Sequence, residues 1–394
     1  MPRTPIYAWT KDARRSIAAL VAGVFVATGL VVGCSTADEE TRRGGDVPAP
    51  DASKDATPTP TPTPSDLSRR PECLHWKVTI VGTEGDDRLV GTAETDVIAG
   101  LGGNDVIVTT SPRDRVCGGE GDDRIEVAGS RTWISAGSGN DRVVAQGRFT
   151  SVRAENGDDT VTVRGQSTSV RPGPGDDLVR NVGGRVAPRN AWYNEPCVGY
   201  GRSDRPVFVD LGKGRARGEG KDRLLGFTCV QASRYADVLI GTSFNDSIDA
   251  TMGGADDRIR TLGGDDLVAA SGGDDQIDVG PGDDVLDAFG GNDRSFGGPG
   301  NDTLRGFWGG DYLNGGAGND RVYGGVECDP ASSYGYGTVD KDPNELLGGP
   351  GDDYITGDLG NDSLDGGPGA DRGQGGYQDG REDLIYSLER FTEC

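Results

Sequence analysis

The residues from Gly297 to Arg305 read Gly-Gly-Pro-Gly-Asn-Asp-Thr-Leu-Arg, and units of this kind recur along most of the chain. A second clear copy begins with Gly366-Gly367-Pro368-Gly369-Ala370-Asp371. Glycine permits tight and left-handed backbone conformations, so the first six positions predict a turn. The last three positions predict a short strand whose aliphatic side chain points into a narrow core.

The units follow a nine-residue period. Aspartates stand at Asp87, Asp96, Asp105, Asp114 and Asp123, and further steps of nine reach Thr132, Asp141, Thr150, Asp159, Thr168 and Asp177. An aliphatic residue stands two positions after each of these eleven sites. A second array starts near Asp237 and Asp246, slips by two residues and continues from Asp257 to Asp329; a third block carries Asp353, Asp362 and Asp371. The period predicts an all-β parallel β-roll in which two units make one coil.

The pattern Gly-Gly-x-Gly-x-Asp-x-aliphatic-x resembles the RTX, or hemolysin-type, calcium-binding repeat family. The resemblance covers most of residues 78–385. It implies that calcium ions lie between turns stacked eighteen residues apart, on the order of ten ions in all. Calcium prefers about six to eight oxygen ligands, and turned backbone carbonyls with short Asp carboxylates supply that chemistry. The candidate metal residues are Asp87, Asp105, Asp123, Asp141, Asp159, Asp177, Asp266, Asp275, Asp284, Asp293, Asp302, Asp311, Asp320, Asp353, Asp362 and Asp371.

The first array predicts calcium along one edge only. Each of its candidate aspartates follows a glycine by two residues, whereas the alternate positions, Asp96, Asp114, Thr132, Thr150 and Thr168, lack that glycine. In the stretch from Asp266 to Asp320 every unit keeps both residues, so calcium is expected on both edges. The competing interpretation is a plain β-helix in which Asp and Gly only build turns. It does not explain why Asp persists at position six while its neighbour varies among Asp, Asn, Ala and Gly.

The N-terminus predicts export. Lys11, Arg14 and Arg15 precede an apolar run from Ile17 to Val32, as in a signal peptide over residues 1–33. Val31-Val32-Gly33-Cys34 resembles the lipobox of bacterial lipoproteins, which implies lipidation of Cys34. Cleavage elsewhere and a retained anchor helix stay open as alternatives. We expect a cell-surface or extracellular protein, anchored by lipid to the bacterial membrane.

The rest of the chain divides at changes in composition and period. Residues 34–70 form a linker whose alternating Thr and Pro residues favour an extended stalk. The first array covers 71–182, a connecting insertion 183–236, the second array 237–329, a loop insertion 330–346, and a third repeat block with the C-terminal cap 347–394. The connecting insertion is either a stapled structural element or a recognition loop.

The cysteines of an exported protein favour disulfides. Neighbours in sequence suggest the pairs Cys73–Cys117, Cys197–Cys229 and Cys328–Cys394, although other pairings remain open.

The composition narrows the function. A formal charge of −24 makes nucleic acid an unsuitable partner, because phosphate binding needs basic patches. His75 is the single histidine, which excludes an HExxH zinc site, and residues 35–77 are too short and polar for a catalytic domain. We expect no enzyme and no catalytic residues. The preferred function is a calcium-stabilised structural or adhesive surface module, with an unknown surface ligand left open. The alternative is an accessory or C-terminal-type module of a secreted hydrolase or toxin-like protein.

Overall fold

The computed structural model describes residues 72–73, 75–183, 196–325, 342–357, 360–375, 384–388 and 390–393. All of them lie in the second of two compact units, Pro58–Cys394. The expectations for Cys34, for the 34–70 linker and for the Cys328–Cys394 pair therefore fall outside the described residues. Within those residues there is no helix, and hence none with the length and apolar character of a membrane span.

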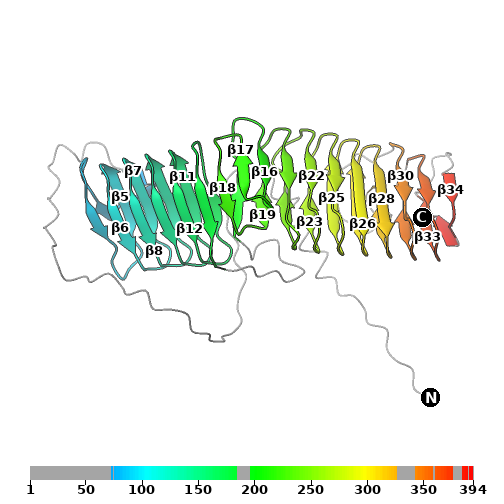
Figure 1. Cartoon of the computed structure of the whole chain (residues 1–394), viewed down its shortest axis with the longest axis horizontal. Helices are drawn as coiled ribbons and strands as arrows, with labels where there is room; N and C mark the ends of the chain where they lie inside the picture. Colours follow the sequence, from blue (N-terminus) through cyan, green and yellow to red (C-terminus); the bar gives the residue numbers. More distant parts are fainter. Residues whose placement is uncertain are drawn as a thin grey trace, which may run out of the picture. The chain divides into compact units, whose positions relative to one another are not determined.

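Two long sheets of short strands run side by side, and the chain alternates between them (Figure 1). The odd sheet is entirely parallel, and most of its partners lie eighteen residues apart, as in Ser151↔Ser169. Its strands, in order, are β3 (Ile80–Val81), β5 (Val97–Gly102), β7 (Arg115–Glu120), β9 (Trp133–Ser138), β11 (Ser151–Asn156), β13 (Ser169–Arg171), β15 (Cys197–Gly199), β19 (Cys229–Gln231), β21 (Ser247–Asp249), β23 (Leu267–Ala269), β25 (Val285–Gly290), β27 (Thr303–Trp308), β29 (Arg321–Tyr323), β31 (Tyr354–Thr356), β33 (Arg372–Gly375) and β35 (Arg390–Glu393).

The even sheet has the same repeat but contains one antiparallel interruption. Its strands, in order, are β4 (Arg88–Val90), β6 (Val106–Thr109), β8 (Arg124–Val127), β10 (Arg142–Ala145), β12 (Thr160–Val163), β14 (Leu178–Asn181), β18 (Arg223–Leu225), β17 (Arg215–Arg217), β16 (Phe208–Asp210), β20 (Val238–Ile240), β22 (Arg258–Arg260), β24 (Gln276–Asp278), β26 (Arg294–Pro299), β28 (Tyr312–Ala317), β30 (Glu345–Leu347), β32 (Ser363–Asp365) and β34 (Leu384–Tyr386). β17 pairs antiparallel with both β16 and β18, and every other neighbouring pair is parallel.

The core is a stack of the aliphatic side chains at position eight. Ile107, Val143 and Val161 on the even sheet face Val116, Val152 and their equivalents on the odd sheet, and all are fully buried. In strands such as β8 and β10, buried side chains alternate with exposed or half-buried ones, as expected for a strand with one face in the core. The predicted all-β parallel solenoid with two units per coil is confirmed.

The segment predicted as a connecting insertion is part of the solenoid from residue 196 onward. β15 pairs with β13 and β19, so it continues the odd sheet, and Val198, Val209 and Leu224 contribute to the same core. The period breaks because the even sheet gains the β16–β17–β18 hairpin, not because the chain leaves the coil. A disulfide joins Cys197 to Cys229 across this segment.

The N-terminal end carries a small antiparallel pair, β1 (Glu72–Cys73) and β2 (Trp76–Lys77). A disulfide from Cys73 to Cys117 ties this pair to β7. The guanidinium of Arg115 lies 3.7 Å from the ring centroid of Trp76. The structure thus contains two of the three disulfides suggested by the sequence.

The solenoid also resumes earlier than the predicted 330–346 loop insertion allows. β30 begins at Glu345 and pairs with β28, and Asn344 takes the position-six place in the preceding turn. The coil is recognisable there only in three dimensions, because an asparagine stands where the repeat has aspartate.

Candidate functional site

The position-six aspartates form a continuous ladder through the turns. The backbone N–H of each aspartate donates to Oδ1 of the aspartate one coil later, for example from Asp123 to Asp141 at 2.8 Å and from Asp141 to Asp159 at 2.7 Å. In the second array Asp284 donates in the same way to Asp302, and Asp302 to Asp320. Of the sixteen candidate metal residues, all except Asp87 are at most 3 % exposed. The ladder therefore buries one carboxylate in each of these turns.

The second carboxylate oxygen, Oδ2, is buried in most of these turns without a hydrogen-bond donor. This holds for Asp105, Asp123, Asp141, Asp159, Asp177, Asp266, Asp275, Asp284, Asp293, Asp302, Asp320 and Asp353. In the first array these residues belong to turns before even-sheet strands, which we call the even edge. In the second array they belong to both the even edge and the odd edge, the turns before odd-sheet strands. A buried acceptor without a partner costs about 1–3 kcal/mol, so this repeated arrangement favours the binding of a partner from outside the protein, such as a cation.

Burial makes the charged form of these carboxylates unfavourable. It raises the pKa of Asp141 to about 6, of Asp123 and Asp159 to about 7, and of Asp177 to about 8. Desolvation is the largest cause; the N–H bond from the preceding coil opposes it, and for most of these groups neighbouring carboxylates add to the rise. A bound cation would offset both the desolvation and the repulsion.

The space beside Oδ2 is shaped by glycine. A Cβ added to Gly118 would collide with Oδ2 of Asp123 and with the carbonyl oxygen of Ala136 in the next coil. Gly297 has the same relation to Asp302 and to the carbonyl of Gly315. A carboxylate oxygen and a carbonyl oxygen from successive coils thus converge without a donor between them, and these are the oxygen types that calcium accepts.

Four aspartates differ, because a Ser or Thr four residues earlier already satisfies them. Oδ2 of Asp87 accepts from the N–H and hydroxyl of Thr83, at 2.5 and 2.9 Å. Asp96, Asp237 and Asp246 are bonded similarly by Thr92, Ser233 and Thr242. Asp87 was a candidate metal residue, and its Oδ2 has no open position. All four have Ser or Thr at position two and lie in the first coil of the first or the second array; Thr110 and Ser271 hold the same position in later turns, so the residue type alone does not identify a closed aspartate.

The odd edge of the first array is built from threonine instead. Thr132, Thr150 and Thr168 are buried, and their hydroxyls donate to the carbonyls three residues earlier at 2.8–3.0 Å. Oδ2 of Asp114 accepts from the Thr109 hydroxyl. Among the described residues this edge has no buried carboxylate oxygen lacking a donor.

A second ladder, at position five, runs along the outside with the opposite polarity. The N–H of Asp122 donates to Oδ1 of Asn104, one coil earlier, and the N–H of Asn140 donates to Oδ1 of Asp122, both at 2.7 Å. One acceptor oxygen suffices here, and Asn and Asp both provide it. This explains why Asn and Asp interchange at position five, a role that the sequence did not reveal.

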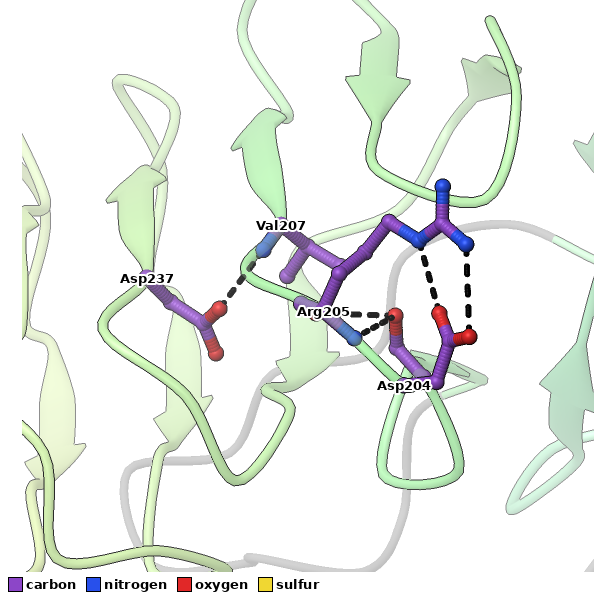
Figure 2. A network of polar contacts seen from close by, with 5 residues as sticks. Asp204, Arg205, Val207 and Asp237 are labelled. Carbon is purple, nitrogen blue, oxygen red and sulfur yellow. Dashed lines mark hydrogen bonds and ion pairs between the residues drawn. The ribbon is translucent and has the colours of Figure 1, made fainter.

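Two further described places at position six carry no carboxylate. Asn344 accepts the N–H of Asp311 through Oδ1, but its Nδ2 is a buried donor without an acceptor, where other coils present Oδ2. At the hairpin, Val207 stands at position six, and its N–H donates to Asp237 at 2.7 Å (Figure 2). Neither residue offers a carboxylate to a cation.

The residues fit calcium better than a metal held by side chains alone. Across the described residues, no three His, Cys, Asp or Glu side chains converge as a metal centre. A cation in these turns would take one or two carboxylates and draw the remaining ligands from backbone carbonyls, as calcium accepts and zinc does not.

The repeat units match a known family model. Residues 79–111, 118–147, 232–253, 252–286, 270–304, 287–322 and 342–373 match the model of the RTX calcium-binding nonapeptide repeat. The chain is similar to the crystal structure of a hyperactive, Ca2+-dependent, β-helical antifreeze protein from an Antarctic bacterium, with 17% identity, a TM-score of 0.20, and coverage of 77% of this chain and 83% of that one. No curated protein sequence matches.

Proposed function

We propose, from the premise that this chain belongs to the family of RTX calcium-binding nonapeptide repeat proteins, that its solenoid folds on calcium and is held together by it. The observation that carries the proposal is the row of buried Oδ2 atoms without donors. The ligands would be the candidate position-six aspartates other than Asp87, together with the carbonyls of their glycine-rich turns. Calcium supplies positive charge there, which keeps the carboxylates ionised inside the protein.

The free energy of calcium binding would then contribute directly to the free energy of folding. The calcium-free chain must bury carboxylates whose pKa values are raised to about 6–8, so at neutral pH much of that charge opposes the coil. Ions that bind only the folded coil shift the equilibrium toward it by mass action. We propose about ten ions, one between successive coils.

The test is a calcium titration of the full chain followed by circular dichroism and calorimetry. A cooperative gain of β-structure with about ten ions bound is expected. A chain that is folded under chelation and takes up no calcium would mean that the turns are a plain β-helix scaffold.

We further propose that the solenoid is a structural or adhesive module carried on the 34–70 stalk and anchored through a lipid at Cys34. The sequence supports this placement, because an apolar run ends in Val31-Val32-Gly33-Cys34. A Cys34→Ser variant is expected to leave the membrane fraction, and an unchanged distribution would refute the anchor. We assign no catalytic step.

The adhesive role has its own experiment. Cells displaying the wild-type chain should attach to a surface with calcium and detach under chelation, and cells lacking the chain provide the control. Attachment that ignores calcium while the solenoid unfolds would favour a purely structural role, or the alternative of an accessory module to a secreted protein.

A further inference from the structure

Two arginines are stacked on the outer face of the odd sheet. Arg153 of β11 and Arg171 of β13 stand at position nine of consecutive odd-sheet units and are paired in register. Neighbouring strands of a sheet lie about 4.8 Å apart, so side chains at paired positions on one face lie next to each other. Arg202 follows β15, and its positive charge acts on both of them. We call Arg153, Arg171 and Arg202 the arginine cluster.

The cluster has no acidic residue at the neighbouring positions of its row. At position nine of β27, by contrast, a guanidinium nitrogen of Arg305 lies 2.8 Å from Oδ1 of Asp287, one coil earlier. The coil before the cluster presents Ser135 at this position, and the coil after it presents Gly199, which has no side chain. A Cβ added to Gly199 would lie 3.7 Å from Cγ of Arg171. The stacked arginines are therefore not neutralised in the way that Arg305 is.

The guanidinium groups of the stacked pair carry donors without acceptors. The Nε atoms of Arg153 and Arg171 are buried and have no hydrogen-bond partner. Both side chains are half-buried, and that of Arg202 is exposed. Glu155 offsets part of the positive charge, but its Oε1 already accepts a hydrogen bond from the Ser135 hydroxyl at 3.1 Å. Two buried N–H donors thus face a place where the described part of the chain supplies no acceptor.

Burial and repulsion both oppose these positive charges. Desolvation is the largest cause that lowers the pKa of Arg153 and of Arg171, and the charges of the neighbouring arginines lower both further. A guanidinium nevertheless stays protonated in a protein. The cluster therefore keeps its charge, and a bound anion would offset both the desolvation and the repulsion.

We propose that the arginine cluster binds a phosphate group on the outer face of the odd sheet. Its three guanidinium groups and Glu155 together carry a formal charge of +2, which matches the dianion of a phosphomonoester. Guanidinium groups donate forked pairs of hydrogen bonds to phosphate oxygens, so one phosphate can be shared by stacked arginines. A carboxylate would bring one negative charge and two oxygens, and would leave part of the cluster unmatched. The site uses none of the position-six aspartates and goes beyond the proposed calcium binding.

The test is isothermal titration of the calcium-saturated full chain with glycerol phosphate, whose calcium salt is soluble. Arg153→Gln and Arg171→Gln each remove one positive charge, and each is expected to weaken binding by about tenfold or more. The matched control is Arg142→Gln, because Arg142 is an exposed arginine of β10 in the even sheet, and it should keep the wild-type affinity. Acetate at the same ionic strength is the control ligand and should bind about tenfold more weakly or less.

Glu155→Gln should change the affinity in the opposite direction. An amide oxygen can still accept the Ser135 hydroxyl, whereas the negative charge beside the cluster is lost. Glycerol phosphate is therefore expected to bind about threefold more tightly or better. A gain of affinity cannot arise from a variant that fails to fold, so this measurement complements the two arginine variants. Weaker binding by Glu155→Gln would contradict the charge matching.

Sedimentation with phosphatidylcholine vesicles, with and without phosphatidic acid, distinguishes a lipid headgroup from a soluble monoester. Binding of glycerol phosphate that both arginine variants weaken supports a soluble ligand. Binding only to vesicles that contain phosphatidic acid, weakened by the same two variants, supports a lipid phosphate. The proposal is overturned if the wild type binds neither, or if Arg142→Gln weakens binding as much as Arg171→Gln does.

Discussion

At the scale of single residues, adjacent positions of one turn have different requirements. Asn140, at position five, is exposed and uses one acceptor oxygen, whereas Asp141, at position six, is buried and presents a second oxygen without a donor. Either Asn or Asp can supply the single acceptor oxygen at position five. At position six, only a carboxylate can place a second, charged oxygen against a cation. The difference can be tested with a reciprocal pair of variants.

We predict that Asp141→Asn loses about one calcium ion, or binds it about tenfold or more weakly, because the charge is removed and the Oδ1 acceptor is kept. Under chelation the same variant should be more stable than wild type by about 1–3 kcal/mol, because it no longer buries a charge. Asn140→Asp is the control and should change neither quantity appreciably. Isothermal titration and chemical denaturation measure both. Equal effects of the two variants would contradict the assignment.

Gly139 tests the turn backbone. Its φ is +127°, and a Cβ there would collide with the carbonyl of Gly121 in the preceding coil. Gly139→Ala is therefore expected to destabilise the calcium-bound chain by about 1–3 kcal/mol or more. Ser138→Ala, at the neighbouring position, should stay within about 0.5 kcal/mol of wild type. Thermal denaturation in calcium compares the two, and similar melting temperatures would show that the turn does not need glycine.

At the scale of elements, each edge of the second array is a column of neighbouring carboxylates. Burial raises the pKa of Asp275 and Asp284 to about 8 and of Asp302 to about 7. An ordinary Asp titrates near 3.9, so between about pH 4 and pH 8 the calcium-free folded state binds more protons than the unfolded state. Its stability is fully present below about pH 4 and is lost as the pH rises through 6–8.

We therefore predict opposite pH dependences with and without calcium. Under chelation, the β signal in circular dichroism should be larger at pH 5 than at pH 8, because protons neutralise the ladder. In saturating calcium, the melting temperature should fall from pH 8 to pH 5, because protons compete with the ion for Oδ2. The same direction in both conditions would show that the aspartates are not the ligands.

The connecting element is stabilised by its disulfide. Cys197 and Cys229 are 32 residues apart and join β15 to β19 in the odd sheet. Closing a loop of this length is worth about 3–4 kcal/mol in the chain-entropy model. We predict that a Cys197→Ser, Cys229→Ser double variant needs more calcium to reach the folding midpoint, with the same final β content. An unchanged calcium midpoint would show that this disulfide does not stabilise the coil.

At the scale of the whole molecule, the net charge of −24 opposes compaction until cations bind. We predict that 0.5 M NaCl raises the β content of the calcium-free chain, because salt screens the repulsion between stacked carboxylates. Sucrose, which stabilises compact states without screening, is the control and should act more weakly. If NaCl and sucrose act alike, charge repulsion is not what keeps the calcium-free chain open.

The solenoid itself was predictable from the sequence because its determinants are local. Each nonapeptide carries its own turn glycines and one core side chain, such as Val143 or Leu304, and each coil contacts only its neighbours. The Gly and Asp positions also predicted that buried aspartates with an open Oδ2 lie on one edge of the first array and on both edges of the second. Calcium binding by these aspartates stays a prediction.

Only the tertiary structure decided which aspartates have an open oxygen and how the chain runs where the nine-residue period breaks. Thr83 donates a hydrogen bond to Oδ2 of Asp87 and so takes the position that a cation would need. The nine-residue period does not reveal this bond. Asp222 and Asn344 join the ladder over separations of 45 and 33 residues, which no nine-residue period reveals. The physical reason is that a repeat specifies contacts at fixed spacing, whereas a hairpin or an insertion restores the same contacts at a spacing that only folding sets.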